Sequence, residues 1–262
     1  MNILDYILLG ILQGFTEWLP VSSEGVITLF SKLVYGQSLE RSLGLAVWLH
    51  TGTLAAAAAY LRGDLLNIVK PVFGREGDRQ LTYFIIVATS ASALTAVPAF
   101  LLLRSLSIPD GAFTLLVGLC LIAVALLNRG QGYSKTRPLD FAVATAAGLV
   151  QGLSIIPGVS RSGVTVTALL FFGFGLNRAL RLSYLMSIPA VAGAQLLLPI
   201  LLGGGVLDWG MFAGALAAAL TGFVTIKSLL KLAGSGHTVL FTYLLGFTLV
   251  FLGLLMEVSG AR

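Results

Sequence analysis

The sequence predicts an all-α polytopic membrane protein, and three observations support this fold class. Hydrophobic residues make up 57% of the 262-residue chain and charged residues only 10%. The mean hydropathy is +0.96, so too little polar surface is available to cover a water-soluble globule. Apolar runs long enough to cross a bilayer recur from end to end. Two similar polar segments interrupt this pattern, one in each half of the chain.

Six apolar stretches are expected to span the membrane. A transmembrane helix needs about 20 predominantly apolar residues. The stretches that meet or approach this length are residues 43–61, 82–103, 112–127, 183–203, 210–230 and 239–256. The N-terminal apolar run lacks a convincing small-residue cleavage site, so we do not expect a removable signal peptide. Cys120, the only cysteine, excludes an intrachain disulfide.

Two further apolar segments, residues 1–36 and 141–176, are predicted to form re-entrant helix-loop-helix hairpins. Residues 13–25 read Gln-Gly-Phe-Thr-Glu-Trp-Leu-Pro-Val-Ser-Ser-Glu-Gly. Residues 151–163 read Gln-Gly-Leu-Ser-Ile-Ile-Pro-Gly-Val-Ser-Arg-Ser-Gly. Irregular backbone at membrane depth is tolerated only where it is buried in protein or lines a wet cavity. We therefore expect each segment to leave the membrane on the side from which it entered.

The distribution of basic residues predicts the orientation. If the loop at 62–80 is cytoplasmic, alternation through the six spans places most basic loop residues inside. The exceptions are Lys32, Arg41, Arg104 and Arg262. The net charge of +5 therefore indicates membrane topology and not a nucleic-acid partner. Both termini are expected outside, with the first hairpin entering from the outer face and the second from the cytoplasm.

The chain is expected to form a single membrane domain, residues 1–262, that contains two inverted halves. The halves are residues 1–127 and 139–256, and each combines one hairpin with three spans. An odd number of spans gives the halves opposite orientations. In such inverted repeats the functional site lies near the midplane of the membrane, where the two repeats meet.

The first hairpin supplies acidic groups. Gln13 and Glu17 are four residues apart, so they share one face of a helix. Glu17 and Glu24 are the only acidic side chains well inside an apolar segment. Because a carboxylate in hydrocarbon is costly, each is a candidate functional residue. The alternatives are a Glu17 that is protonated or paired with a base, and a Glu24 that reaches water at the hairpin tip.

The second hairpin supplies groups suited to an oxyanion. Its loop combines glycines, hydroxyls and one arginine, and the relevant residues are Gly158, Ser160, Arg161, Ser162 and Thr165. Backbone N–H groups and a guanidinium can surround a tetrahedral anion, especially if a helix begins near Gly163. The alternative is a purely structural ion pair between Arg161 and Glu17.

Both hairpin motifs resemble those of the undecaprenyl pyrophosphate phosphatases, also called bacitracin-resistance proteins. The resemblance covers nearly the whole chain and includes residues 48–54, 60–62 and 181–189. It implies removal of the terminal phosphate from a polyprenyl diphosphate with a divalent cation, which regenerates a monophosphate lipid carrier. It also places the acidic pair of the family on Gln13 and Glu17 and the nucleophile on Ser23. The implied phosphate-binding residues are Ser160, Arg161, Ser162 and Thr165.

Two positions depart from the pattern of this family. Val26 stands where many members have histidine, and Gln13 stands where a second glutamate is common. Either Glu24 takes over the missing role, or the histidine is not needed, or the lipid substrate differs. We interpret His50 as a polar hinge at the start of a transmembrane helix. His237 lies in a Gly-Ser loop.

The expected mechanism combines the two half-sites. Gln13 and Glu17 hold Mg²⁺ or Ca²⁺, with Glu24 as a further candidate ligand, and Arg161 stabilises the transferred phosphoryl group. Ser23 either attacks the phosphorus or positions a water molecule, and the sequence leaves both open. The predicted catalytic residues are Glu17, Ser23, Arg161 and Glu24. The predicted substrate-binding residues are Ser22, Ser160, Ser162, Thr165 and Gly158.

The expected partners are a polyprenyl diphosphate and the lipid bilayer of the plasma membrane, without nucleic acid. We expect the site to open to the outer face, and a monomer and a homodimer both stay open. A lipid-phosphate transporter is the main alternative, because inverted repeats with broken helices are also a transporter architecture. A catalytically silent drug-resistance protein is a third.

Overall fold

The computed structural model describes residues 1–103, 110–127, 137–156, 159–202, 208–233 and 238–258. Every regular element in these ranges is helical, which confirms the all-α prediction. The elements are α1 (Ile3–Thr16), α2 (Ser23–Tyr35), α3 (Leu39–Tyr60), α4 (Arg62–Val69), the 3₁₀ turn η1 (Lys70–Phe73), α5 (Arg79–Leu103), α6 (Asp110–Leu127), α7 (Phe141–Gly152), the 3₁₀ turn η2 (Leu153–Ile155), α8 (Arg161–Phe171), α9 (Leu176–Leu202), α10 (Trp209–Ala233) and α11 (Thr238–Val258).

Four helices are long and apolar enough to cross a membrane. The qualifying segments are Glu40–Tyr60, Arg79–Leu101, Leu176–Leu197 and Trp209–Ala233, in α3, α5, α9 and α10. Large apolar side chains are exposed on these helices, for example Leu94, Leu196 and Leu220. Such surfaces suit contact with lipid. The helices at the other two predicted spans, α6 and α11, are not among the four, and their crossing stays a prediction.

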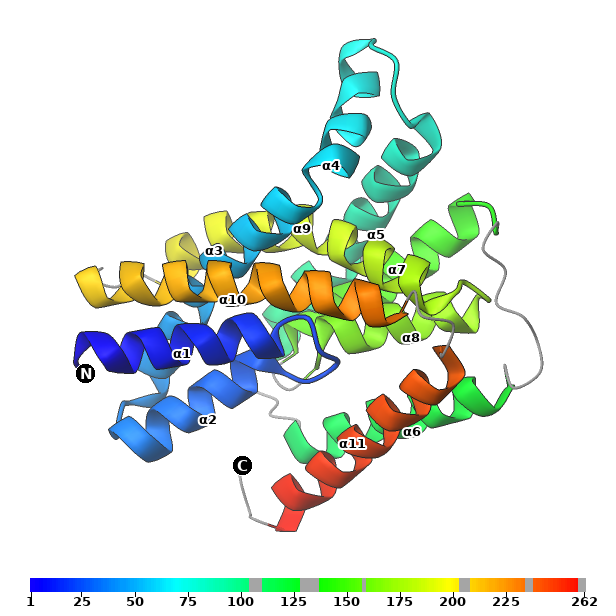
Figure 1. The fold of residues 1–262 in the computed structure, drawn as a ribbon. Coiled ribbons are helices and arrows are strands. Elements are labelled where there is room, and N and C mark those ends of the chain that lie inside the picture. Colours follow the sequence, from blue (N-terminus) through cyan, green and yellow to red (C-terminus); the bar gives the residue numbers. More distant parts are fainter. Residues whose placement is uncertain (104–109, 128–136, 157–158, 203–207, 234–237, 259–262) are drawn as a thin grey trace.

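Each of the two segments predicted to form a hairpin contains a pair of short helices that pack against each other, α1 with α2 and α7 with α8 (Figure 1). That the two pairs are re-entrant stays a prediction. Each second helix begins at a serine cap. The Ser22 hydroxyl accepts a hydrogen bond from the backbone N–H of Gly25 at 3.1 Å. The Ser160 hydroxyl accepts one from Gly163 at 3.2 Å. A serine cap satisfies a backbone donor that the first helical turn leaves free, so the serine after each break starts the returning helix.

Two predicted helix starts need correction. α3 begins at Leu39, after the cap residue Ser38, so His50 lies inside this helix and not at its start. α9 begins at Leu176 and therefore before the predicted residue 183. Basic side chains in its first turns lower the local hydropathy, so the hydropathy pattern did not indicate where this helix begins. In the structure Arg181 pairs with Asp64 at 2.7 Å, and such pairing offsets the polar character of the segment.

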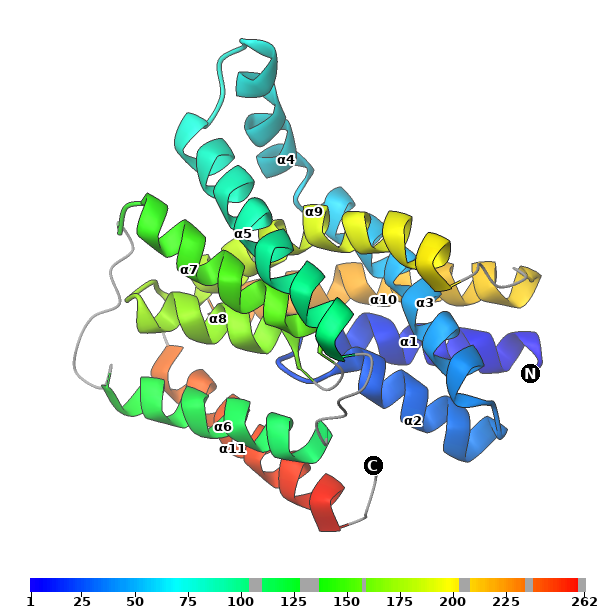
Figure 2. The same cartoon turned by 180° about the vertical axis from the view of Figure 1, so that it is seen from behind.

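Small residues let the short hairpin helices approach the long helices closely. α1 packs along α10, and α7 packs along α5 (Figures 1 and 2). A Cβ atom built on Gly10 would lie 2.0 Å from the backbone oxygen of Gly214, and one on Gly148 would lie 2.3 Å from that of Ala88. Close backbone approach at glycine is a common way to associate helices in membranes. This packing places both hairpin tips at the centre of the helix bundle.

Helices α6 and α11 form a pair that lies apart from the rest of the bundle. α6 and α11 pack chiefly against each other, and α6 also contacts α8 (Figure 2). Buried Leu121 of α6 and Leu249 of α11 join the main apolar core, which also contains Trp18, Phe84 and Tyr184.

Candidate active site

The carboxylate of Glu17 is the centre of the site. Glu17 follows α1 at the first hairpin tip, and its side chain is only 5% exposed. Its Oε2 atom accepts hydrogen bonds from the Ser23 hydroxyl at 2.6 Å and from Nε2 of Gln13 at 3.0 Å. Its Oε1 atom accepts one from Nη2 of Arg161 at 2.6 Å. The predicted meeting of the two hairpins at Glu17 and Arg161 is therefore confirmed.

The Arg161 side chain is held from two sides. As the first residue of α8 it reaches across to the other hairpin, where its guanidinium lies 5.8 Å from the centre of the Trp18 ring. The Trp18 ring in turn packs edge-on against Tyr184, with 5.0 Å between centroids. The Nη1 atom of Arg161 is buried and has no hydrogen-bond partner among the described residues. The site thus contains a fixed cation with an unused donor, which suits a phosphate oxygen.

His50 belongs to this site, so its interpretation as a hinge is wrong. Its Nε2 atom lies 3.1 Å from Oε2 of Glu17, and its Nδ1 atom lies 2.7 Å from the backbone oxygen of Ala46. Both neighbours are acceptors, so both contacts are hydrogen bonds only when the ring carries two protons. Because His50 and Glu17 are on different helices, no sequence spacing could reveal the contact.

The charges around Glu17 favour an anionic ligand. Arg161 and His50 both face this one carboxylate, and His50 adds a second positive charge when its ring carries two protons. Glu24, in the first turn of α2, interacts electrostatically with His50 but forms none of the hydrogen bonds of Glu17 described above. Buried cations of this kind are retained where a carboxylate or a bound anion offsets their desolvation.

The other predicted binding residues shape the two tips. The Ser162 hydroxyl donates to the backbone oxygen of Leu19 at 2.6 Å, which links the second hairpin to the first. The Ser160 hydroxyl lies 3.3 Å from that of Ser162. Thr165 donates to the backbone oxygen of Arg161 at 2.8 Å and also contacts the Ser183 hydroxyl. With Ser22 acting as a helix cap, these hydroxyls hold the loops in shape. Gly158 and His237 lie outside the described residues.

Gln13 offers an oxygen of the type that binds a hard cation. Its Oε1 atom is buried and has no partner among the described residues, while its Nε2 atom contacts Glu17. The part of the chain that the structure describes has no group of three or more His, Cys, Asp or Glu side chains that could hold a metal ion. Gln13 Oε1 and the Glu17 carboxylate are oxygen atoms of the kind that a hard cation takes as ligands, and a cation at these two residues stays a prediction.

Comparison with known proteins gives the family. The model described as bacitracin resistance protein BacA matches residues 6–251. The chain belongs to the BacA family. Among the relatives of this BacA chain is an undecaprenyl-diphosphatase from Haloarcula marismortui, 39% identical over 246 residues, or 88% of the chain and 89% of the relative. Another undecaprenyl-diphosphatase, from Methanococcoides burtonii, is 35% identical over 243 residues, or 89% and 91%. A third, from Moorella thermoacetica, is 35% identical over the full length of both proteins. The BacA match spans all residues of the Glu17 cluster.

Proposed function

We propose that the chain is an integral membrane phosphatase that hydrolyses undecaprenyl diphosphate, or a related polyprenyl diphosphate, to the monophosphate lipid carrier and phosphate. The observation that carries this proposal is the contact between Arg161 and Glu17 next to the Ser23 hydroxyl. This contact joins a group that binds phosphate, a base and a nucleophile in one buried cluster. Membership of the BacA family and relatives named undecaprenyl-diphosphatase support the same activity.

Arg161 binds the terminal phosphoryl group. Its Nη1 atom has an unused donor. Arg161 is also the first residue of α8, and the N-terminus of a helix favours an anion because the backbone N–H groups of its first turn point outward. His50 supplies a second cation on the other side of Glu17. In phosphoryl transfer such groups stabilise charge on the oxygens of the transferred phosphoryl group.

Ser23 acts as the nucleophile and Glu17 as its base. The Ser23 hydroxyl already donates to Glu17 at 2.6 Å, so the proton passes to that carboxylate as Oγ attacks the terminal phosphorus. The bond from this phosphorus to the bridging oxygen breaks, and the lipid monophosphate leaves. Water then hydrolyses the phosphoserine and releases phosphate. A rapid acid quench with labelled substrate tests this route, since direct attack by a water molecule that Ser23 positions leaves no labelled protein.

Gln13 and Glu17 would hold a divalent cation, Mg²⁺ or Ca²⁺, and Glu24 interacts electrostatically with His50, which contacts the same carboxylate. When bound, the cation neutralises charge on the diphosphate.

The proposal includes a topology of six membrane crossings and two re-entrant hairpins, in a plasma-membrane protein whose site opens to the outer face. The packing of α1 on α10 and of α7 on α5 supports the inverted repeat, since in each case the first hairpin helix of one half packs on the second predicted span of the other half. The matching caps Ser22 and Ser160 support it as well.

Release of phosphate from undecaprenyl diphosphate by the purified protein tests the proposal. We expect turnover that depends on a divalent cation and is severely reduced in Arg161→Ala. Lipid translocation in proteoliposomes without phosphate release would instead indicate a lipid-phosphate transporter. Inactivity in both assays would overturn the proposed function.

A further inference from the structure

Helix α4 and the 3₁₀ turn η1 form an arm that extends from the bundle beside the first part of α5 (Figures 1 and 2). One face of this arm is apolar and exposed. Leu66 is 60% exposed and Phe73 is 74% exposed, and Val69 and Val72 are exposed as well. Because Leu66, Val69 and Phe73 recur at helical spacing, their side chains form one stripe. An exposed apolar stripe of this kind marks a surface that binds lipid or another protein.

The charged residues of the arm are distributed as an anionic partner requires. Arg62 lies four residues before Leu66 and Lys70 lies four residues after it, so both exposed basic residues flank the stripe. Asp64 is the only acidic residue of the arm, and it faces the bundle, where it pairs with Arg181. The outward face therefore combines apolar and basic side chains. This composition is typical of helices that lie at the surface of an anionic membrane.

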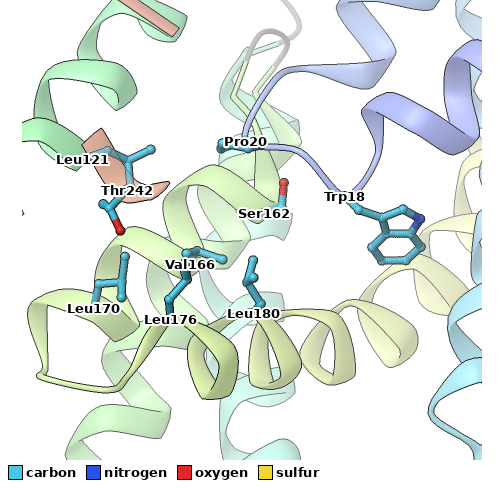
Figure 3. Close-up of a pocket in the computed structure, with 9 residues that line it drawn as sticks. All are labelled: Trp18, Pro20, Leu121, Ser162, Val166, Leu170, Leu176, Leu180 and Thr242. Carbon is cyan, nitrogen blue, oxygen red and sulfur yellow. The ribbon is translucent and has the colours of Figure 1, made fainter. Parts of the chain in front are cut away.

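The ion pair with Asp64 holds the base of the arm to a helix of the core. The Nε and Nη2 atoms of Arg181 donate to the Asp64 carboxylate at 3.0 and 2.7 Å. Arg181 directly follows Leu180 of α9. Figure 3 shows that Leu180 and Leu176 of α9 line a small apolar pocket together with Val166 of α8. The arm is therefore anchored to a helix that packs against the second hairpin.

Two hydrogen bonds set the depth of the arm along α5. The Thr82 hydroxyl donates to the backbone oxygen of Ile68 at 2.8 Å. The backbone N–H of Asp78 donates to the backbone oxygen of Asn67 at 3.0 Å. Thr82 lies in the first turn of Arg79–Leu101, one of the segments long and apolar enough to cross a membrane. The arm is thus level with the end of a spanning segment, where the lipid head groups begin.

We propose that the exposed face of the arm lies in the head-group layer of the bilayer and binds anionic phospholipid. The apolar stripe enters the boundary between head groups and acyl chains, and Arg62 and Lys70 bind lipid phosphates. The partner is the leaflet at this end of α3 and α5. The depth of the arm favours lipid over a water-soluble protein, which would need the stripe to face water. This inference does not depend on the proposed phosphatase activity.

Fluorescence quenching in phosphatidylcholine vesicles tests the location without requiring turnover. The full-length protein, with Cys120→Ala, carries a nitrobenzoxadiazole label on Leu66→Cys or on Asn67→Cys. Successive residues of a helix lie about 100° apart, so the label on Asn67→Cys, which is exposed but off the stripe, is the matched control. We expect nitroxide lipid to quench the label on Leu66→Cys, and aqueous iodide to quench mainly the label on Asn67→Cys. Equal access of iodide to both labels would overturn the proposal and leave the stripe to a protein partner.

A comparison of two nitroxide lipids tests the role of charge. The nitroxide is carried by phosphatidylglycerol in one set of vesicles and by phosphatidylcholine in the other, in equal amounts. Phosphatidylglycerol should quench the label on Leu66→Cys about twofold more, because basic residues at the surface attract anionic lipid. Lys70→Gln should reduce this difference, whereas Lys231→Gln, at an exposed basic residue in the last turn of α10, should retain it. Equal quenching by the two lipids, or equal effects of the two substitutions, would overturn anionic-lipid binding by the arm.

Discussion

Glu17 receives its contacts from four separate segments of the chain. Gln13 lies on α1, Ser23 on α2, His50 on α3 and Arg161 on α8. A buried carboxylate is stable only when such partners offset its loss of hydration. The same partners make the site sensitive to single substitutions, because removing the carboxylate leaves buried cations without a counter-charge.

Glu17→Gln should lower turnover by about 10²–10⁴-fold, since the base for Ser23 is lost. The response to divalent cations should weaken as well, because Gln13 and a second amide bind a hard cation poorly. Phosphate release measured across a metal titration checks both effects. The matched control is Glu40→Gln, which changes an exposed glutamate at the start of α3 and should behave as wild type. Unchanged activity with an unchanged metal titration in Glu17→Gln would remove Glu17 from the mechanism.

His50→Asn should reduce kcat by about 10²-fold, because it removes the second cation at Glu17.

Glu24→Thr tests the other candidate for the role of the histidine that Val26 replaces. We expect a smaller loss from Glu24→Thr, and partial recovery when Val26→His is added to it. Steady-state kinetics of the variants show which of the two substitutions causes the larger loss of kcat. Wild-type kcat in His50→Asn together with a severe loss in Glu24→Thr would assign the role to Glu24 alone.

The pairing of Glu17 with Arg161 was predictable from the sequence, because a buried charge needs a partner of opposite charge. Glu17 and Arg161 each lie in an apolar segment, and this cost led to the prediction that they meet. His50 was not predictable in this way, because a histidine can also be neutral and the sequence alone does not require a partner for it. The contact of His50 with Glu17 depends on the packing of α3 against the first hairpin, which the sequence does not specify.

At the scale of elements, the hairpins followed from the sequence because proline, glycine and serine break an otherwise apolar run. Their close packing against α5 and α10 was not predictable, since it depends on which small residues face each other. The start of α9 was missed because Arg178 and Arg181 lower the local hydropathy. Tertiary contacts stabilise both residues, through the backbone oxygen of Arg137 for Arg178 and through Asp64 for Arg181.

Gly10→Ala should lower the melting temperature in detergent, because its Cβ would meet the backbone of Gly214 and push α1 away from α10. Gly44→Ala is the matched control, since a Cβ there has nothing within 4 Å. Alanine is favoured over glycine in a helix by about 1 kcal/mol, so the control should keep or raise the melting temperature. Equal melting temperatures for both variants would show that the α1–α10 contact does not need this close approach.

At the scale of the whole molecule, the inverted topology makes a prediction about sidedness. Single cysteines in place of Ser38 and Glu76, in a Cys120→Ala background, should be labelled from opposite sides of the membrane. Ser38 lies between the first hairpin and α3, and Glu76 lies beyond the far end of that spanning helix. An impermeant thiol reagent on intact cells should label only the cysteine at position 38. Labelling of both positions from one side would contradict six crossings with the termini outside.

The ion pair at the hairpin tips also sets an order of events during synthesis. Glu17 and Arg161 are separated by 144 residues. At about 5–20 residues per second, Arg161 is made roughly 7–30 s after Glu17. During that interval the carboxylate has no guanidinium partner. A nascent chain that stops before Arg161 therefore offers Gln13, Ser23 and His50 as partners for this carboxylate but lacks its guanidinium.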